Sequence, residues 1–291
     1  EDIVASLNGV YTSLTQSYVA DNYHYFTDVR ANATVVTNSG ANSGIPYQFY
    51  NYTLTEENQY VYNRYTQLFK SISRANTLFA HLGDVSYATP SARDTYEAEA
   101  RFLRAYFYFE LVKRYGGVPI IGDKVYELNE NIELPRSTFE QCIKYIVSEL
   151  DDIKDDLRSL PLPDAAASAH VVNTQAAQAL KIRVLLYAAS PLFNEKPIES
   201  GNELIGYASY DRERWKIAAD AALNFINTYG TGDGAIMGLD DNFKNVFTNW
   251  YSNEHKEVIF FRENAMDKTV ETANGPLGLS GAKQGNGRTN P

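Results

Sequence analysis

The chain reads RDTYEAEARFLRAYFYFELVKRYGGVPII from Arg93 to Ile121, and this stretch decides the fold. Apolar and aromatic side chains recur in it at helical spacing, at Ala98, Phe102, Ala105, Tyr106, Phe109 and Val112, with a second stripe at Leu103, Phe107 and Leu111. A helix that is apolar over so much of its surface is typical of a buried central helix. The triplet Tyr115-Gly116-Gly117 predicts its end, because glycine adopts the left-handed conformation at little cost, and Pro119 prevents a restart.

The polar residues of this helix are spaced as ion pairs. Glu97 precedes Arg101 by four positions, and Glu110 precedes Arg114 by four positions. Acid before base at this spacing stabilises a helix modestly. We therefore predict both pairs on the polar face that remains.

The run EAEARFLRAYFYFELVKRYGGVPII, residues 97–121, resembles the signature of the SusD/RagB family, the surface nutrient-binding lipoproteins of Gram-negative outer membranes. Further segments resemble the family in the family's order: YNRYTQLFKSISRAN (62–76), LPRSTFEQCIKYIVSELDDI (134–153), TQAAQALKIRVLLYAASPLFN (174–194), RERWKIAADAALNFI (212–226) and NEHKEVIFFRE (253–263). The resemblance covers nearly the whole chain. It is specific for the family and not for the ligand.

Composition excludes several classes of protein. The net charge of −10 argues against binding to a phosphate backbone, which needs clustered Lys and Arg. A single cysteine, Cys142, rules out an internal disulfide, and we expect it to be a buried, inert thiol. No run of eighteen apolar residues predicts a membrane span. The 22 tyrosines are the unusual feature; most of those within helices are expected to fill helix interfaces.

Helical patterns continue on both sides of the central stretch. They predict a first helix over residues 3–14, a second that Thr55 caps and Gly83 ends, and a third that begins at the capping box Ser137 to Glu140 and closes at Pro161. Another helix is expected to start at Asn173 or Thr174 and to break at Pro191. Asp211 is expected to cap the last, which ends at Gly230 and has an inward face of Trp215, Ala218, Ala219, Ala222, Phe225, Ile226 and Tyr229.

Irregular segments separate or follow these helices. Residues 21–53 form a long, aromatic-rich loop without periodicity, and long loops in compact domains are often functional. The apolar run 258–261 predicts a short strand. Residues 262–291 read as an irregular, Gly-rich tail.

Two polar features invite a functional interpretation that we do not favour. Asn76 shares the apolar face of its helix, and we expect a buried amide bonded to neighbouring backbone. The acidic run Asp151, Asp152, Asp155 and Asp156 suggests a cation site, but a solvated helix face is the expected role.

No motif supports catalysis. The four histidines are scattered without an HExxH spacing, and no GxSxG surrounds a serine. Glu97 and Glu99 lie roughly 200° apart on a helix and cannot face one sugar. Gly230 opens a glycine-rich run that follows a helix rather than a strand, so it fails as a nucleotide loop. We predict a protein that is not an enzyme and uses no cofactor, and we assign no residue to a metal ion; whether a metal ion is bound stays open.

The resemblance implies more than the residues do alone. It implies a mainly all-α fold of tetratricopeptide-like antiparallel helix pairs, with long irregular loops and minor short β-strands, as a single domain over 1–291. It also implies that the chain is truncated at its C-terminus, since family members continue beyond a motif like the closing GRTNP, and that an export signal and an N-terminal lipid anchor precede Glu1. The implied location is the cell surface of the outer membrane.

Three functions follow as hypotheses. The first is an oligosaccharide-binding module that delivers its ligand to a SusC-like TonB-dependent transporter, as the resemblance implies. The second is a peptide-binding member of the same family. The third is a helical-repeat scaffold that binds no small ligand.

The aromatic loop favours the first two hypotheses. The resemblance implies seven ligand-binding residues. Asp28 and Arg30 would form hydrogen bonds with hydroxyl groups, and Tyr47, Phe49 and Tyr50 would stack on the ligand. Trp250 and Tyr251 would complete the binding surface. The alternative is that Phe49 and Tyr52 fasten the loop to the helices.

Overall fold

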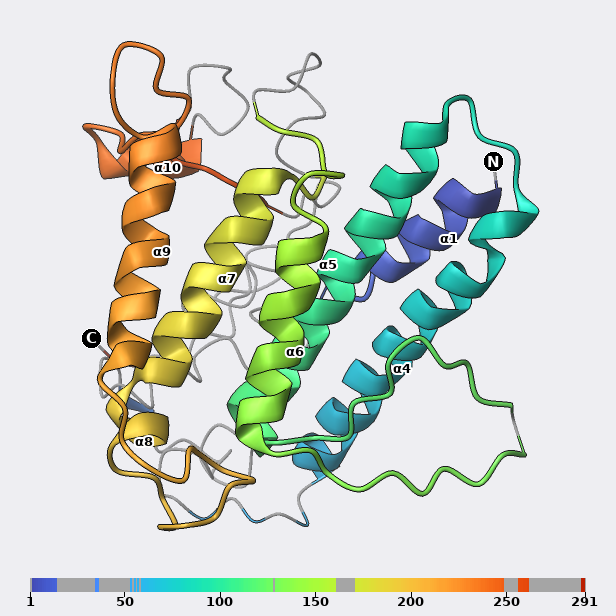
Figure 1. Ribbon diagram of the computed structural model, residues 1–291, viewed down its shortest axis with the longest axis vertical. Helices are drawn as coiled ribbons and strands as arrows, with labels where there is room; N and C mark the ends of the chain where they lie inside the picture. The colour runs from blue at the N-terminus through green and yellow to red at the C-terminus, as the bar shows by residue number, and fades with distance from the viewer. Residues whose placement is uncertain are drawn as a thin grey trace, which may run out of the picture. The chain divides into compact units, whose positions relative to one another are not determined.

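The residues that the structure describes are mostly helical, as predicted, with one very short pair of strands (Figure 1). The computed structural model describes residues 2–14, 35–36, 53, 55, 57, 59–127, 129–160, 171–248, 256–261 and 289–290. Its helices are α1 (Asp2–Tyr11), α4 (Gln59–His81), the 3-10 helix η1 (Leu82–Asp84), α5 (Pro90–Tyr115), α6 (Phe139–Asp152), α7 (Thr174–Ala189), α8 (Pro191–Asn194), α9 (Glu213–Tyr229) and α10 (Phe243–Thr248). Its strands are β1 (Val35–Val36) and β2 (Thr289–Asn290), which pair antiparallel.

The chain divides into two compact units. One contains Glu1–Ser13 and Leu68–Arg262, and the other contains Leu14–Gln67 and Glu263–Pro291. The paired strands belong to the second unit. The expected single domain over 1–291 stays a prediction.

Helix α5 is the buried centre of the first unit, as its sequence predicts. Thr89 caps its first turn by accepting the Ala92 N–H, and Pro90 occupies the first turn, where its missing N–H costs nothing. Phe102 and Phe109 are buried, whereas Tyr106, expected on the same face, is only half-buried. Successive helices α5, α6 and α7 run antiparallel side by side, and α9 follows beside α7 (Figure 1).

The two glycines after α5 do more than end the helix. Gly116 has a φ of 71°, and a β-carbon there would lie 2.3 Å from the Leu204 carbonyl oxygen. A β-carbon at Gly117 would lie 2.0 Å from the Ser137 carbonyl oxygen. The Gly117 N–H donates to the Leu204 oxygen at 2.6 Å. Only glycine admits this approach, which places the chain near Leu204 against the start of α6.

A cluster of buried charges joins α5 to α6. Arg104, which is 2% exposed, donates to Glu149 Oε2 at 2.7 Å, and Arg101 donates to Glu149 Oε1 at 2.8 Å. Burial alone would raise the pKa of Glu149, but hydrogen bonds and charge from both arginines bring it below its ordinary value. The predicted pair Glu97–Arg101 is therefore wrong, because a neighbouring helix offers Arg101 a less exposed carboxylate. Glu97 instead lies 3.6 Å from Arg93.

The other predicted pair of the central helix is confirmed but buried. Arg114 donates to Glu110 Oε2 at 2.6 Å, and Lys113 pairs with the same carboxylate. Only 5% of the Glu110 side chain is exposed, so this pair does not lie on a solvated face. Burial acts to raise the pKa of Glu110, and the two cations lower it below its usual range.

Asn76 has the structural role that we expected. Its amide nitrogen donates to the Gly122 and Lys124 carbonyl oxygens, both at 2.9 Å, and its amide oxygen accepts from Arg104 at 2.9 Å. The buried amide thus ties the segment after α5 to α4.

A second buried cluster ties α1 to α5. The Tyr11 hydroxyl donates to Glu99 Oε2 at 2.5 Å and accepts the Val172 N–H at 2.9 Å. Arg158 pairs with the same carboxylate. Burial raises the pKa of Glu99, while Tyr11 and Arg158 act against that rise.

Several predicted element ends differ from the structure. Helix α4 begins at Gln59, so Thr55 lies too far upstream to cap it. The capping box of α6 is present one residue later than predicted, with Thr138 as N-cap and Gln141 as its partner, because Phe139 is already helical and buried. Residues 258–261 form no strand: the Ile259 carbonyl accepts the Asn173 side-chain amide at 3.0 Å, at the N-terminus of α7.

The acidic run is only partly a solvated helix face. Helix α6 ends at Asp152, so Asp155 and Asp156 lie in the turn beyond it. Asp151 binds Lys181 of α7 at 2.6 Å, and Asp152 lies 3.2 Å from Arg101. Half of the run therefore fastens α6 to its neighbours.

The predicted inward face of α9 is mostly not buried. Asn173 caps α7, as expected. The N-cap of α9 is Arg212 and not the expected Asp211, although the Asp211 carboxylate accepts the Glu213 N–H. Within the described parts of the chain, however, Ala218 is the only buried residue of α9, while Trp215 is 38% and Ile226 is 52% exposed. Helix α9 is the outermost of the helices that lie side by side, so α7 covers only one of its faces.

Candidate functional site

All seven sequence-predicted binding residues lie outside the described residues. Asp28, Arg30, Tyr47, Phe49 and Tyr50 fall within 15–34 and 37–52, and Trp250 and Tyr251 fall within 249–255. Their roles stay predictions. The described residues contain a different candidate, which the sequence did not suggest.

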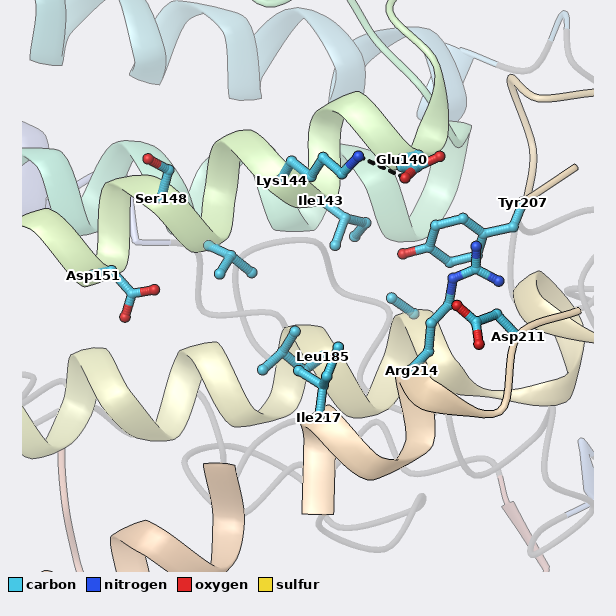
Figure 2. Close-up of a pocket in the computed structure, with 12 residues that line it drawn as sticks. Glu140, Ile143, Lys144, Ser148, Asp151, Leu185, Tyr207, Asp211, Arg214 and Ile217 are labelled. Atoms are coloured by element: carbon cyan, nitrogen blue, oxygen red, sulfur yellow. Dashed lines mark ion pairs between the residues drawn. The ribbon is translucent and has the colours of Figure 1, made fainter. Parts of the chain in front are cut away.

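A cavity of about 510 Å³ opens between α6, α7 and the start of α9 (Figure 2). We call it the α6–α7–α9 groove. The residues that line it are Glu140, Ile143, Lys144, Val147, Ser148, Asp151, Leu185, Ala188, Tyr207, Asp211, Arg214 and Ile217.

Helix periodicity places half of this lining on one element. The six residues of α6 recur at intervals of three and four, so they share one face of the helix from Glu140 to Asp151. Ile143 is buried on this face, whereas Val147 is half-buried at the groove. The sequence signal that could have revealed the groove is the width of the apolar face of α6, which is larger than contact with one neighbouring helix would bury.

The floor of the groove is aliphatic. Ile143 and Val147 come from α6, Leu185 and Ala188 from α7, and Ile217 from α9. Figure 2 shows Ile143, Leu185 and Ile217 facing one another across the space between these helices. Ala188 contributes only a methyl group, which leaves the space unfilled.

Arg214 is held in place at one end of the groove. Its Nη1 donates to Asn194 Oδ1 at 2.6 Å and to the Ser209 carbonyl oxygen at 2.8 Å, and its guanidinium carbon lies 3.6 Å from the centre of the Tyr207 ring. These contacts are with neutral groups. Among the ion pairs of the described residues, none involves Arg214.

Tyr207 beneath this guanidinium is a buried phenol. Burial raises its pKa to about 12, although the charge of Arg214 lowers it. The hydroxyl is therefore protonated at neutral pH and remains a hydrogen-bond donor. Phe139 packs edge-on against the ring, with the two centroids 5.3 Å apart.

Two other charged groups of the lining are in ion pairs, and Asp211 has a neutral hydrogen-bond donor. Lys144 lies 2.7 Å from Glu140 on the same helix, and Asp151 binds Lys181. Asp211 uses its carboxylate to accept the Glu213 N–H at 2.9 Å. Within the described residues, Arg214 is therefore the cation of the groove that has no carboxylate at ion-pair distance.

The groove offers charged and apolar side chains that can bind a ligand. The described residues include no group of three His, Cys, Asp or Glu side chains placed to hold a metal ion. They also include no helix that is long and apolar enough to cross a membrane.

Comparisons with known proteins agree on one family. A family model described as "Starch-binding associating with outer membrane" (SusD-like) matches residues 2–186. The SusD-like proteins P38 and P2 of Formosa agariphila are each 25% identical to this chain, over 157 and 174 residues. These matches cover 54% and 57% of this chain, but 30% and 34% of those proteins.

Solved structures share the fold. A surface glycan-binding protein A from Bacteroides uniformis superposes with a TM-score of 0.70 at 19% identity, over 99% of this chain and 58% of that one. A laminarin-binding SusD-like protein gives 0.63 at 20% identity, over 85% of this chain and 48% of that one. A SusD superfamily protein from Parabacteroides distasonis gives 0.70 at 19% identity, over 100% and 57%. This chain spans about half the length of the proteins that it resembles.

Proposed function

This chain belongs to the SusD-like family, and on that premise we propose that it binds oligosaccharides at the cell surface and passes them to a TonB-dependent outer-membrane transporter. The observation that carries the proposal is the match of the starch-binding family model over residues 2–186. Two proteins that share the fold are named for glycans, one for laminarin and one as a surface glycan-binding protein, which supports a carbohydrate ligand.

The proposed mode of action is binding, without catalysis and without a cofactor. We place the sugar at the loop of residues 21–53, where aromatic faces would stack on pyranose rings and polar groups would bond hydroxyls. Asp28, Arg30, Tyr47, Phe49 and Tyr50 are its proposed contacts, and Trp250 and Tyr251 are proposed to complete them.

The test is calorimetric titration of the chain with a panel of starch, laminarin and other oligosaccharides, and with short peptides. We expect at least one oligosaccharide to bind. Tyr47→Ala, Tyr50→Ala and Trp250→Ala should each weaken that binding by about 1–2 kcal/mol and leave the melting temperature unchanged. Tyr210→Ala is the matched control, because Tyr210 is 55% exposed outside the loop.

Two results would contradict this placement of the site. If all three substitutions lower the melting temperature and none changes affinity, the loop is scaffolding. If peptides bind and no oligosaccharide does, the peptide-binding function replaces the proposed one.

Transfer to a transporter and location at the outer membrane need a cellular test. The lipidated full-length protein should fractionate with outer membranes and co-purify with a SusC-like transporter, and its deletion should slow uptake of the oligosaccharide that binds. Unchanged uptake in the deletion strain would refute the transfer step while leaving glycan binding intact.

A further inference from the structure

We infer that the α6–α7–α9 groove is a docking site for a short polypeptide segment of a partner protein, one that presents an apolar side chain next to a carboxylate. This inference concerns residues other than the proposed sugar contacts. It does not depend on the proposed function.

The floor of the groove suits a polypeptide better than a sugar. Pyranose rings bind to exposed aromatic faces, but Tyr207 is the one aromatic residue of the lining and is 8% exposed. Arg214 covers one face of its ring at 3.6 Å, and Phe139 packs against it edge-on. The rest of the floor is aliphatic and would bury an apolar side chain through the hydrophobic effect.

Arg214 adds the charge complementarity. Asn194, the Ser209 carbonyl and the Tyr207 ring hold the guanidinium in place. No carboxylate of the described residues lies within ion-pair distance of it, although Asp211 lines the same end of the groove (Figure 2). A preorganised guanidinium binds a carboxylate through two parallel hydrogen bonds, and little side-chain entropy is lost because the group is already ordered. An acidic side chain or a chain terminus of the partner would supply that carboxylate.

The dimensions fit a linear segment. The lining face of α6 from Glu140 to Asp151 covers about 16 Å at a rise of about 1.5 Å per residue. An extended peptide covers this length with about five residues at about 3.3 Å each. The apolar side chain would enter between Ile143, Leu185 and Ile217, and its acidic neighbour would reach Arg214 (Figure 2).

Two pairs of variants isolate the groove. Arg214→Gln removes the charge, and Arg212→Gln is its control because Arg212 is an exposed residue at the same helix end. Ile217→Glu changes the floor at a residue that is 47% exposed, and Leu223→Glu is its control on the same helix, 56% exposed and outside the lining. The Ile217 variant keeps the test valid if loss of the Asn194 contact prevents Arg214→Gln from folding.

The probe is a phage library of random 12-residue peptides selected on the immobilised 291-residue chain. We expect the enriched peptides to carry an apolar residue within two positions of Asp, Glu or a free C-terminus. Synthesised with a fluorescent label, they should bind at least tenfold more weakly to Arg214→Gln and Ile217→Glu than to the wild type. Binding to the two controls should stay within twofold, and oligosaccharide binding should be unchanged in all four variants.

Three outcomes would overturn the inference. One is a selection that enriches no peptide over an empty surface, or only peptides without a carboxylate. Another is an affinity that neither groove variant changes. The third is displacement of the peptides by starch or laminarin oligosaccharides in a manner that Ile217→Glu abolishes, which would make the groove a sugar site.

Discussion

Replacing Glu149 with Gln should destabilise the first unit far more than an ordinary loss of charge does. Glu149 accepts hydrogen bonds from Arg101 and Arg104, and 10% of its side chain is exposed. Arg104 is 2% exposed, and its Nε already lacks a hydrogen-bond partner within the described part of the chain. Glutamine keeps the shape but removes the charge and turns one acceptor into a donor, which leaves Arg104 buried beside a neutral group.

The size of the expected loss of stability depends on the partners that Arg101 and Arg104 keep in the variant. Breaking a buried ion pair costs about 3–5 kcal/mol when one charge is left uncompensated. Asp123 still lies 2.6 Å from Arg104, and Asp152 still lies 3.2 Å from Arg101. We therefore expect a loss at the lower end, about 3 kcal/mol, which corresponds to a fall of about 6–12 °C in Tm for a unit of this size.

The pH dependence of the free energy of unfolding is a second test of the role of Glu149. The pKa of Glu149 is lowered in the folded protein, so its stabilisation is fully present above the unfolded value of about 4.3 and is lost as the pH falls through the folded value. Glu149→Gln lacks this contribution at every pH. Its free energy of unfolding should therefore change less between about pH 5 and pH 3 than that of the wild type.

The assay is urea unfolding followed by circular dichroism at pH 7 and at lower pH. Glu140→Gln is the matched control, because Glu140 lies on the same helix but its ion pair with Lys144 is exposed, and such pairs contribute about 0–1 kcal/mol. Equal losses for the two variants, or the same acid dependence in Glu149→Gln and the wild type, would refute the reasoning.

Three further predictions test the packing around α5. Phe109→Ala should lower the free energy of unfolding by about 3–5 kcal/mol, because Phe109 is 1% exposed and its removal leaves a cavity beside Tyr187. The oligosaccharide affinity of the folded protein should stay the same. A stable variant that no longer binds would contradict a purely structural role. Gly117→Ala should prevent stable folding, since its β-carbon would lie 2.0 Å from the Ser137 carbonyl oxygen. Gly234→Ala is the control and should change Tm by little, because no atom lies within 4 Å of its β-carbon. Similar Tm values for the two variants would disprove the close approach at Gly117. Cys142 should react with a thiol reagent only on unfolding, because the thiol is buried and burial raises its pKa; fast labelling of the native protein would show that it is accessible.

The sequence alone determined the features that depend on backbone period and local capping. The 3.6-residue spacing of apolar side chains identified α5 as buried, and the glycines after Tyr115 identified its end. Asn173 was correctly placed at the start of α7. These features are predictable because each is decided within one or two helical turns of the chain.

The tertiary structure decided which helix supplies each polar side chain with a partner. Arg101 has Glu97 one turn away in sequence, yet it binds Glu149 of α6 because that carboxylate is less exposed and is shared with Arg104. The run 258–261 has the composition of a strand, but it forms none, and its Ile259 carbonyl accepts a hydrogen bond from the Asn173 side chain. Spacing within one element carries no information about its neighbours, so neither outcome could be read from the chain.

The groove has the same origin. Its lining combines residues from α6, α7, α9 and the segment that contains Tyr207, none of which is unusual in its own element. Arg214 became a candidate because the fold surrounds it with neutral acceptors and an aromatic ring. A charge acquires a binding role from what the rest of the fold places, or does not place, within a few ångströms of it, and that is decided only when distant segments meet.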